Sequence, residues 1–132
     1  MRVKIKQLLS VLTSVIFILC LSVSTFAFVD SSDTNSVNFS LAFDSDKASC
    51  TVEIKGAEGT DSISNCTVTL KDNGGTFTKT WSGLSVSGGT LRVIKSTSGV
   101  VKGHTYTLSV TATVHRNGKT ETVTDSFTLK YN

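Results

Sequence analysis

The strongest constraint on this chain is an alternation of apolar and polar residues with a period of two, which recurs from Val37 to Tyr131. Successive side chains of a β-strand point to opposite faces, so this period predicts strands with one buried face. Turn-forming sequences, such as residues 72–75 and Asn117-Gly118, separate the runs. The pattern predicts an all-β fold, a two-sheet antiparallel sandwich of about seven strands. The predicted strands are residues 37–43, 48–54, 66–70, 77–81, 91–94, 105–114 and 123–131.

One residue of the last run breaks the alternation. Asp125 falls in phase with the apolar residues Val123 and Phe127. A carboxylate buried there without partners would cost several kcal/mol. A β-bulge near Thr124 would turn the carboxylate outward, and we prefer this interpretation; the alternative is that the strand lies at the edge of its sheet.

Residues 1–27 have the three parts of a secretory signal peptide. Residues 1–6 are basic, residues 8–23 are mostly apolar, and Thr25-Phe26-Ala27 supplies the small residues that signal peptidase requires, which predicts cleavage before Phe28. A retained transmembrane anchor is disfavoured because it needs about 20 apolar residues, and serines and threonines interrupt this run. Acylation of Cys20 is a weaker alternative. We expect a signal peptide at 1–27, a flexible segment at 28–35 and a β-sandwich domain at 36–132.

The distribution of charge argues against a nucleic-acid partner. Arg2, Lys4 and Lys6 account for the whole excess of 13 basic over 10 acidic residues, so the processed chain is neutral. Binding to nucleic acid requires clustered basic side chains that displace counterions from phosphate. No second apolar segment follows the first. We therefore expect a secreted, extracellular protein that is free of the membrane after signal removal, with at most a loose association with the cell envelope.

Two cysteines, Cys50 and Cys66, remain after removal of the signal peptide, and both fall in the apolar phase of their strands. If these are the second and third strands of the sandwich, they lie in opposite sheets, and a disulfide between them would cross the core. An oxidising compartment and an even count of cysteines favour this bridge. The alternative is a pair of reduced cysteines that pack as small apolar residues.

The sequence predicts no catalytic, cofactor or metal site. His104 and His115 are the only histidines, and we expect both in exposed loops. A catalytic role would require a nucleophile and an orienting acid beside one of them. A calcium site would require about six to eight oxygen ligands, whereas Asp44-Ser45-Asp46 fits an ordinary hairpin turn equally well. The acidic residues that could supply such ligands are Asp30, Asp33, Asp44, Asp46 and Asp61.

Residues 101–110, with the sequence Val-Lys-Gly-His-Thr-Tyr-Thr-Leu-Ser-Val, resemble the stretch that leads into strand F of fibronectin type III and related immunoglobulin-like domains. In those domains a glycine turn precedes a tyrosine whose hydroxyl bonds back to the backbone. The resemblance implies that Gly103 makes the turn and that Tyr106 is the corner tyrosine. Lys102 stands where those domains usually have proline. We expect the Tyr106 hydroxyl to bond to a backbone group between Gly99 and Lys102.

The whole of residues 36–132 is also similar to a group of small secreted Gram-positive proteins of unknown function that carry one immunoglobulin-like domain. Lys47-Ala48-Ser49-Cys50, Trp81 and Gly103-His104-Thr105-Tyr106 carry this resemblance. These are fold motifs, so the resemblance implies architecture and location but supplies no active-site residues.

The function that we expect is that of a non-enzymatic extracellular binding module for an unidentified protein or glycan. Trp81 is the candidate exposed binding aromatic, because Lys79 shares its face of the strand. The alternative is a secreted inhibitor or effector that inserts the loops at 56–60 and 72–75 into an extracellular enzyme.

Overall fold

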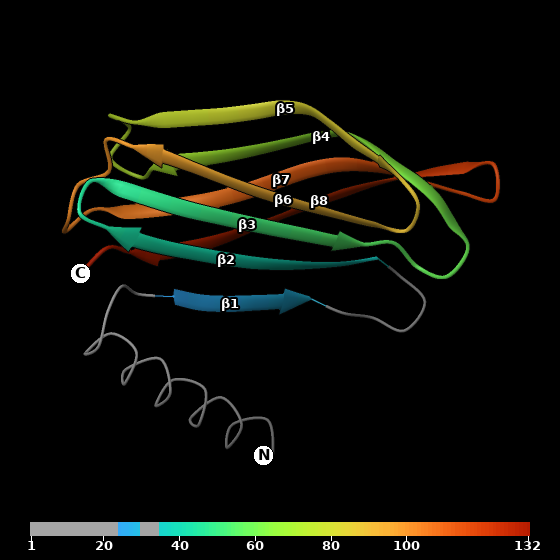
Figure 1. The fold of residues 1–132 in the computed structure, drawn as a ribbon, viewed down its shortest axis with the longest axis horizontal. Helices are drawn as coiled ribbons and strands as arrows, with labels where there is room; N and C mark the ends of the chain where they lie inside the picture. Colours follow the sequence, from blue (N-terminus) through green and yellow to red (C-terminus); the bar gives the residue numbers. More distant parts are fainter. Residues whose placement is uncertain (1–23, 30–34) are drawn as a thin grey trace, which may run out of the picture.

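The computed structural model describes residues 24–29 and 35–132, and these residues form eight β-strands and no helix (Figure 1). Strands β2 to β8 are the seven that the alternation predicts, and β1 is additional. The predicted all-β fold is therefore confirmed. The strands are β1 (Ser24–Val29), β2 (Ser36–Asp44), β3 (Lys47–Lys55), β4 (Thr60–Asp72), β5 (Thr78–Ser87), β6 (Thr90–Ser98), β7 (Thr105–Arg116) and β8 (Lys119–Lys130).

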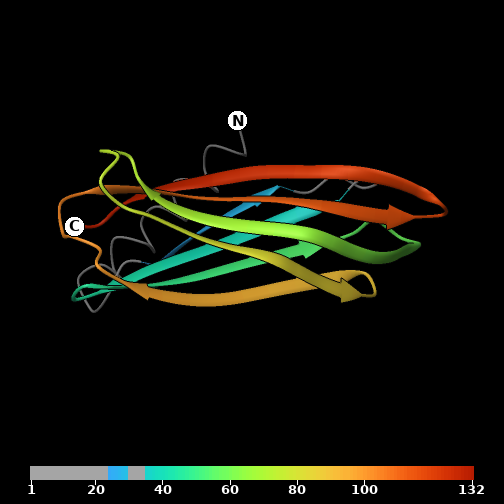
Figure 2. The same cartoon turned by 90° about the horizontal axis from the view of Figure 1, so that it is seen from above.

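The strands form two antiparallel sheets that pack face to face (Figure 2). Sheet A has the strand order β1-β2-β3-β6, and sheet B has the order β5-β4-β7-β8. The chain passes from sheet A to sheet B after β3, returns after β5 and leaves again after β6. This order of strands is that of an immunoglobulin-like β-sandwich, as predicted.

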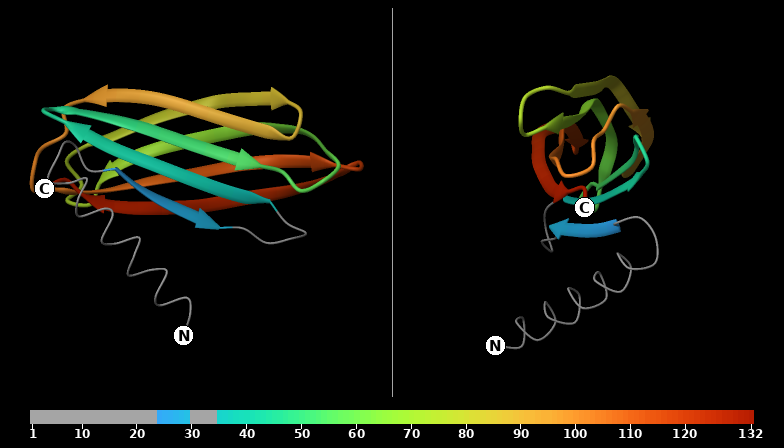
Figure 3. Two further views of the ribbon diagram at one scale, coloured as in Figure 1. Left: turned by 60° about the horizontal axis from the view of Figure 1, so that its bottom comes forward. Right: turned by 90° about the vertical axis from the view of Figure 1, so that its left-hand side faces the viewer.

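The core lies between the sheets, where the inward residues of both alternations meet. Phe39, Leu41 and Val52 of sheet A form one buried cluster with Val68 and Leu108 of sheet B, and none of the five is more than 1% exposed. The end-on view in Figure 3 shows strands of both sheets surrounding this core. All buried apolar residues among the described side chains lie in residues 37–131.

Strand β1 lies beside β2 at the edge of sheet A (Figure 3, left). The pairing is antiparallel and runs from Ser24 opposite Ala42 to Val29 opposite Val37. Strand β1 therefore includes the predicted cleavage site before Phe28 and the first two residues of the predicted segment 28–35. The basic and apolar parts of the predicted signal peptide lie outside the described residues. No helix in the described part of the chain is long and apolar enough to cross a membrane.

Asp125 lies on an edge strand, and the bulge that we preferred near Thr124 is wrong. The register between β7 and β8 runs without interruption from the pair Thr105–Lys130 to the pair Arg116–Lys119. Because β8 is the outermost strand of sheet B, Asp125 is only half-buried in its inward phase. Its carboxylate accepts a hydrogen bond from the Ser126 N–H at 2.8 Å. Water can reach a carboxylate at an edge, so the cost of burying a charge is avoided.

Bulges occur in β4 and β5 instead. At Ser64 and Asn65, β4 has an extra residue relative to both of its neighbours, and Asn65 has a φ of 49°. Asparagine tolerates this left-handed conformation better than most residues. As a result Ile63 and Cys66 both point into the core, although they are three positions apart. This break in the period explains why β4 begins at Thr60 although the alternation predicts a strand only from Cys66.

Candidate binding surface

The Tyr106 corner closes one end of the sandwich. The Tyr106 side chain is fully buried, and its hydroxyl accepts a hydrogen bond from the Val101 N–H at 2.8 Å, within the stretch Gly99 to Lys102 named from the sequence. Gly103 has a φ of 94°, a conformation that residues with a Cβ rarely adopt. Its N–H donates to the Tyr131 carbonyl at 2.6 Å. The corner therefore connects the start of β7 to the end of the chain.

A buried carboxylate, Asp72, lies at the same end, and the sequence analysis missed it. Its side chain is 3% exposed and accepts hydrogen bonds from three donors. These are His104 Nδ1 at 2.6 Å, the Gly74 N–H at 2.8 Å and the Thr76 hydroxyl at 3.0 Å. The hydrogen bond from His104, followed by that from Gly74, holds the pKa of Asp72 below its usual value. This network satisfies the buried charge and fastens the β4–β5 turn to the residue before β7.

The two histidines are at opposite ends of the sandwich, and each has a specific partner. His104 is 42% exposed, in keeping with the expected loop position, but its ring bonds to Asp72. His115 Nε2 lies 2.8 Å from Ser64 Oγ, beside the bulge in β4. A hydroxyl next to an imidazole is the first contact of a catalytic dyad. Within residues 35–132, no carboxylate forms a hydrogen bond to His115, so the pair lacks the acid that orients the imidazole in a catalytic triad. The contact is a hydrogen bond between the neighbouring strands β4 and β7.

Cys50 on β3 and Cys66 on β4 are both buried in the core, and they come from opposite sheets as expected. The predicted bridge between them is not formed in this structure, in which both are free thiols. Facing sheets lie about 10 Å apart, whereas a disulfide requires Cα atoms within about 7 Å. Burial raises the pKa of Cys50 to about 12 and also raises that of Cys66, which disfavours the thiolate form of both side chains.

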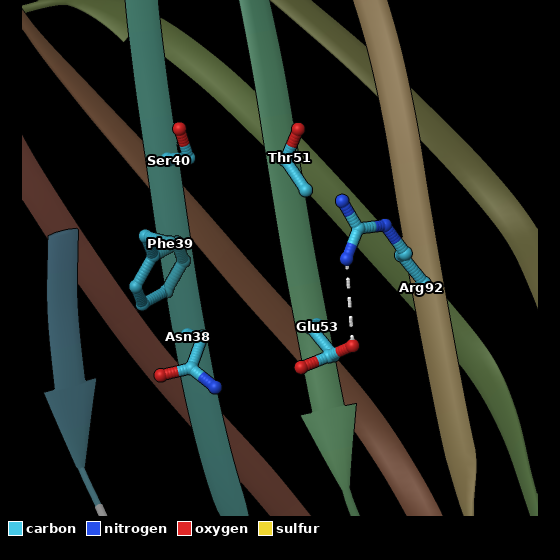
Figure 4. A pocket seen from close by; sticks show the side chains of 6 residues that line it. All are labelled: Asn38, Phe39, Ser40, Thr51, Glu53 and Arg92. Carbon is cyan, nitrogen blue, oxygen red and sulfur yellow. Dashed lines mark ion pairs between the residues drawn. The ribbon is translucent and has the colours of Figure 1, made fainter. Parts of the chain in front are cut away.

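The outer face of sheet A carries a groove across three strands, lined by five polar side chains and by Phe39 (Figure 4). Asn38, Phe39 and Ser40 come from β2, Thr51 and Glu53 from β3, and Arg92 from β6. The hollow has a volume of about 230 Å³, and Arg92 forms an ion pair with Glu53 across it, with 3.6 Å between Nη1 and Oε2. Pockets for small molecules usually measure about 300–1,000 Å³. A shallow polar groove of this size suits part of a larger ligand.

The outer face of sheet B differs, because hydroxyl groups cover it in rows that run from strand to strand. Thr69 Oγ1 lies 3.3 Å from Thr80 Oγ1, and Thr107 Oγ1 lies 3.0 Å from Thr128 Oγ1. Neighbouring hydroxyls on this face thus bond to one another. Sheet A therefore offers the more differentiated of the two outer faces, since it combines a cation, an anion, an amide and hydroxyls.

Trp81 belongs to neither outer face. It lies opposite Val68 in the register of β4 and β5, in the inward phase, and it packs half-buried against the core. Lys79 shares this phase, opposite Leu70, as the sequence analysis expected. The indole is thus only partly available as a binding aromatic, because strand β5 turns much of it toward the core.

The structure separates several groups that the sequence analysis considered together. The loops at 56–60 and 72–75 precede and follow β4, whose 13 residues span about 40 Å, so they lie at opposite ends of the sandwich. Asp44 and Asp46 lie at the β2–β3 turn, at the end of the sandwich that the Tyr106 corner closes, and Asp61 lies at the start of β4, at the other end. Asp30 and Asp33, the other acidic residues considered as possible calcium ligands, are outside the described residues. Within the described part of the chain, no cluster of acidic, histidine or cysteine side chains could hold a metal.

No protein-family model matches the chain, and no curated protein matches it. Among solved structures, it is similar to the GAE domain of GGA2p from Saccharomyces cerevisiae, at 13% identity over 80% of this chain and 96% of that chain, with a TM-score of 0.48. It is also similar to a β-glucuronidase from Parabacteroides merdae, at 17% identity over 79% of this chain and 13% of that chain, with a TM-score of 0.36. Neither likeness carries a functional argument at these values. The strand order itself defines the immunoglobulin-like sandwich.

Proposed function

We propose that the protein is exported, cleaved before Phe28, and acts without catalysis as an extracellular or cell-envelope binding module. The observation that carries this proposal is the groove on the outer face of sheet A. Its side chains include the Arg92–Glu53 ion pair and the amide and hydroxyl groups of Asn38, Ser40 and Thr51. One positive charge, one negative charge and neutral hydrogen-bonding groups lie in this groove. This combination suits a polar partner without a large net charge, such as a glycan or the surface of a protein.

Binding is tested with the processed protein, residues 28–132, on an array of bacterial and host glycans and by capture of surface proteins from the producing cells. Arg92→Ala removes the cation of the groove and leaves Glu53 unpaired, so retention should fall about tenfold or more. Lys71→Ala, on the outer face of sheet B, is the matched control and should bind like the parent. Equal binding by the Arg92→Ala variant would exclude this groove as the site.

Export is tested separately by N-terminal sequencing of the protein recovered from culture medium. The basic start, the apolar run and Thr25-Phe26-Ala27 support a first residue at Phe28 or within a few positions of it. An intact N-terminus in the membrane fraction would contradict export with processing.

A second function, inhibition of an extracellular enzyme, has one observation in its favour. The turn at 72–75 is rigid, because Asp72 Oδ1 accepts from the Gly74 N–H, the Gly75 N–H donates to the Asp72 carbonyl at 2.8 Å, and the Asn73 N–H donates to Thr105 at 2.9 Å. Rigid loops lose little entropy on binding. Only one of the two loops could enter a given enzyme, since they lie at opposite ends. An Asn73→Arg substitution should abolish inhibition through this turn and leave glycan or surface binding unchanged.

A further inference from the structure

Three of the strands at sheet edges carry a charged residue at a position in the inward phase of the strand. In the register with the neighbouring strand, Lys79 of β5 lies opposite Leu70, Lys95 of β6 opposite Cys50, and Asp125 of β8 opposite Val110. Each charged residue therefore occupies a position in the phase of the buried core. An inward charge at an edge opposes the addition of another strand, because the added strand would cover the charge. Strand β5 also has a bulge at Gly83, with a φ of 72°, which bends this edge.

Strand β2 carries no such feature. Its inward residues Val37, Phe39, Leu41 and Phe43 are apolar and at most 3% exposed. Its outward residues between Ser36 and Asp44 are uncharged, and its register with β3 is uninterrupted over the same nine residues. Strand β2 is thus long and regular, and it is uncharged until its last residue, Asp44, which are the properties of an edge that accepts another strand.

In the unprocessed chain, β1 occupies this edge. The pairs run from Ser24 with Ala42 to Val29 with Val37. Cleavage before Phe28 would remove the partners of Phe39 through Ala42 and leave only Phe28 and Val29 paired. A segment of two residues is too short to be a stable strand. The backbone N–H and C=O groups on this side of β2 would then lack partners in the processed chain.

We propose that the exposed edge of β2 pairs with β2 of a second copy of the processed chain, antiparallel about a two-fold axis at Ser40. This proposal rests on the processing step of the proposed function. A two-fold axis at this position places Ser40 opposite Ser40, Phe39 opposite Leu41, and Asn38 opposite Ala42. All of these residues are uncharged, so the strand pairs with itself without like-charge repulsion. Cyclic two-fold dimers are also the commonest symmetric assemblies.

The dimer joins the two copies of sheet A into one continuous sheet. When the axis is perpendicular to the sheet, both cores remain on one side and both outer faces on the other. The two polar grooves, each of which includes Asn38 and Ser40 of β2, then lie next to each other on one surface. A partner with repeated features could engage both grooves at once, which raises the apparent affinity by an effective-concentration effect.

The test compares chains that begin at Phe28 and at Ser24, both ending at Asn132, by sedimentation over a range of concentrations. The shorter chain should dimerise reversibly, and the longer chain should remain a monomer because β1 covers the edge. Since recombinant protein has a defined first residue, this experiment does not depend on processing in the cell, which N-terminal sequencing examines. A shorter chain that stays monomeric at millimolar concentration would overturn the proposal, even if it captures some other protein.

Substitutions in the shorter chain identify the edge. Ser40→Lys places two like charges opposite each other at the axis and should weaken the dimer about fivefold or more. Thr51→Lys is the control: it lies beside Ser40 on the same face, but on the interior strand β3, and should leave the dimer intact. An equimolar mixture of the Ser40→Lys and Ser40→Glu variants should restore dimers. If Ser40→Lys dimerises with the same affinity as Thr51→Lys, β2 is not the interface. The same conclusion follows if the mixture of the Ser40→Lys and Ser40→Glu variants remains monomeric.

Discussion

The two ends of the sandwich are built differently. At the corner end, which comprises the turn at 72–75, residues 99–106, Ser45 and Tyr131, two hydrogen-bonded polar side chains are buried. Tyr106 is fully buried and Asp72 is 2% exposed. At the bulge end, which comprises residues 56–65 and 115–118, the polar side chains are half-buried or exposed. Examples are Ser64 with His115 at 2.8 Å and the Asn117 N–H with Asp61 at 3.2 Å.

This difference teaches which contacts of the domain should carry stability. A buried polar group loses its hydration, so removal of its partner costs more than at the surface. The corner end also brings together distant parts of the chain, because the Tyr131 hydroxyl donates to the Ser45 carbonyl at 2.7 Å and the Tyr131 ring stacks on Phe43 with centroids 4.6 Å apart. We therefore expect the corner end to be the more sensitive to substitution.

The largest effect should come from Tyr106→Ala. The substitution removes a buried ring that contacts Phe43, at 5.4 Å between centroids, and leaves a cavity. The free energy of unfolding should fall by about 3–5 kcal/mol, as measured by urea denaturation. Thr107→Ala is the control, because Thr107 points to the outer face; it should cost about 1 kcal/mol or less. If Thr107→Ala costs as much as Tyr106→Ala, the assigned phase of β7 is wrong.

Tyr106→Phe should have the next largest effect. The ring remains, but the hydroxyl that accepts from the Val101 N–H is lost. The free energy of unfolding should fall by about 1–3 kcal/mol. An unchanged urea midpoint would indicate that water replaces the hydroxyl and that the corner bond adds nothing to stability.

Asp72→Asn should change the dependence of stability on pH. Because the folded state lowers the pKa of Asp72, its stabilising contribution is fully present above the unfolded pKa of about 3.9 and is lost as the pH falls through the lower folded value. The variant should be less stable than the parent at pH 7, and the difference should shrink as the pH falls below about 4. Asp44→Asn, at the exposed end of β2, is the control for the loss of one carboxyl group. If the difference in the free energy of unfolding between Asp72→Asn and the parent stays constant in acid, Asp72 is not an ionised, hydrogen-bonded carboxylate in the folded protein.

At the bulge end, Ser64→Ala should have only a small effect. It removes the hydrogen bond to His115, which is partly exposed, so the loss should be about 1 kcal/mol or less. If the urea midpoint falls further than for Tyr106→Phe, the proposed ranking of the two ends is reversed.

A reducing agent should have no effect. Cys50 and Cys66 are free thiols in the core between the two ends, so dithiothreitol should leave the urea midpoint unchanged. Thiol titration should find both groups after denaturation and neither before it, because burial raises the pKa of Cys50 to about 12. A lower urea midpoint with reductant would show that a disulfide between Cys50 and Cys66 links the two sheets. Stability would then depend less on the contacts at the corner end.

The fold was predictable because the alternation is local. One face of each strand must be apolar, and this pattern is readable in residues such as those from Tyr106 to Val114 without knowledge of any neighbour. The alternation failed to predict the start of β4, because the extra residue at Asn65 shifts the phase between Ile63 and Cys66. The alternation also failed to predict β1, because residues 24–27 lie in the predicted signal peptide and Phe28 and Val29 lie in the predicted flexible segment.

The buried polar contacts were not predictable in the same way. Asp72 and His104 are 32 positions apart, and only the pairing of β4 with β7 brings them together. The sequence Asp-Asn-Gly-Gly indicated a turn, and an aspartate at the first position of a turn often bonds to the backbone two residues later, as Asp72 does with Gly74. That signal could have identified the carboxylate as an acceptor, but not its histidine partner. The groove of sheet A likewise depends on which strands are neighbours.

The inward charges on β5, β6 and β8 also limit how far an assembly of this protein can grow. A sandwich in which several edges can accept another strand can pair with several copies at once and polymerise into fibres, as in cross-β structures. Lys79, Lys95 and Asp125 oppose strand addition at the other edges. A chain that pairs through β2 therefore binds only one other copy. Its association ends at two copies, and a raised protein concentration increases the fraction of dimer without initiating a filament.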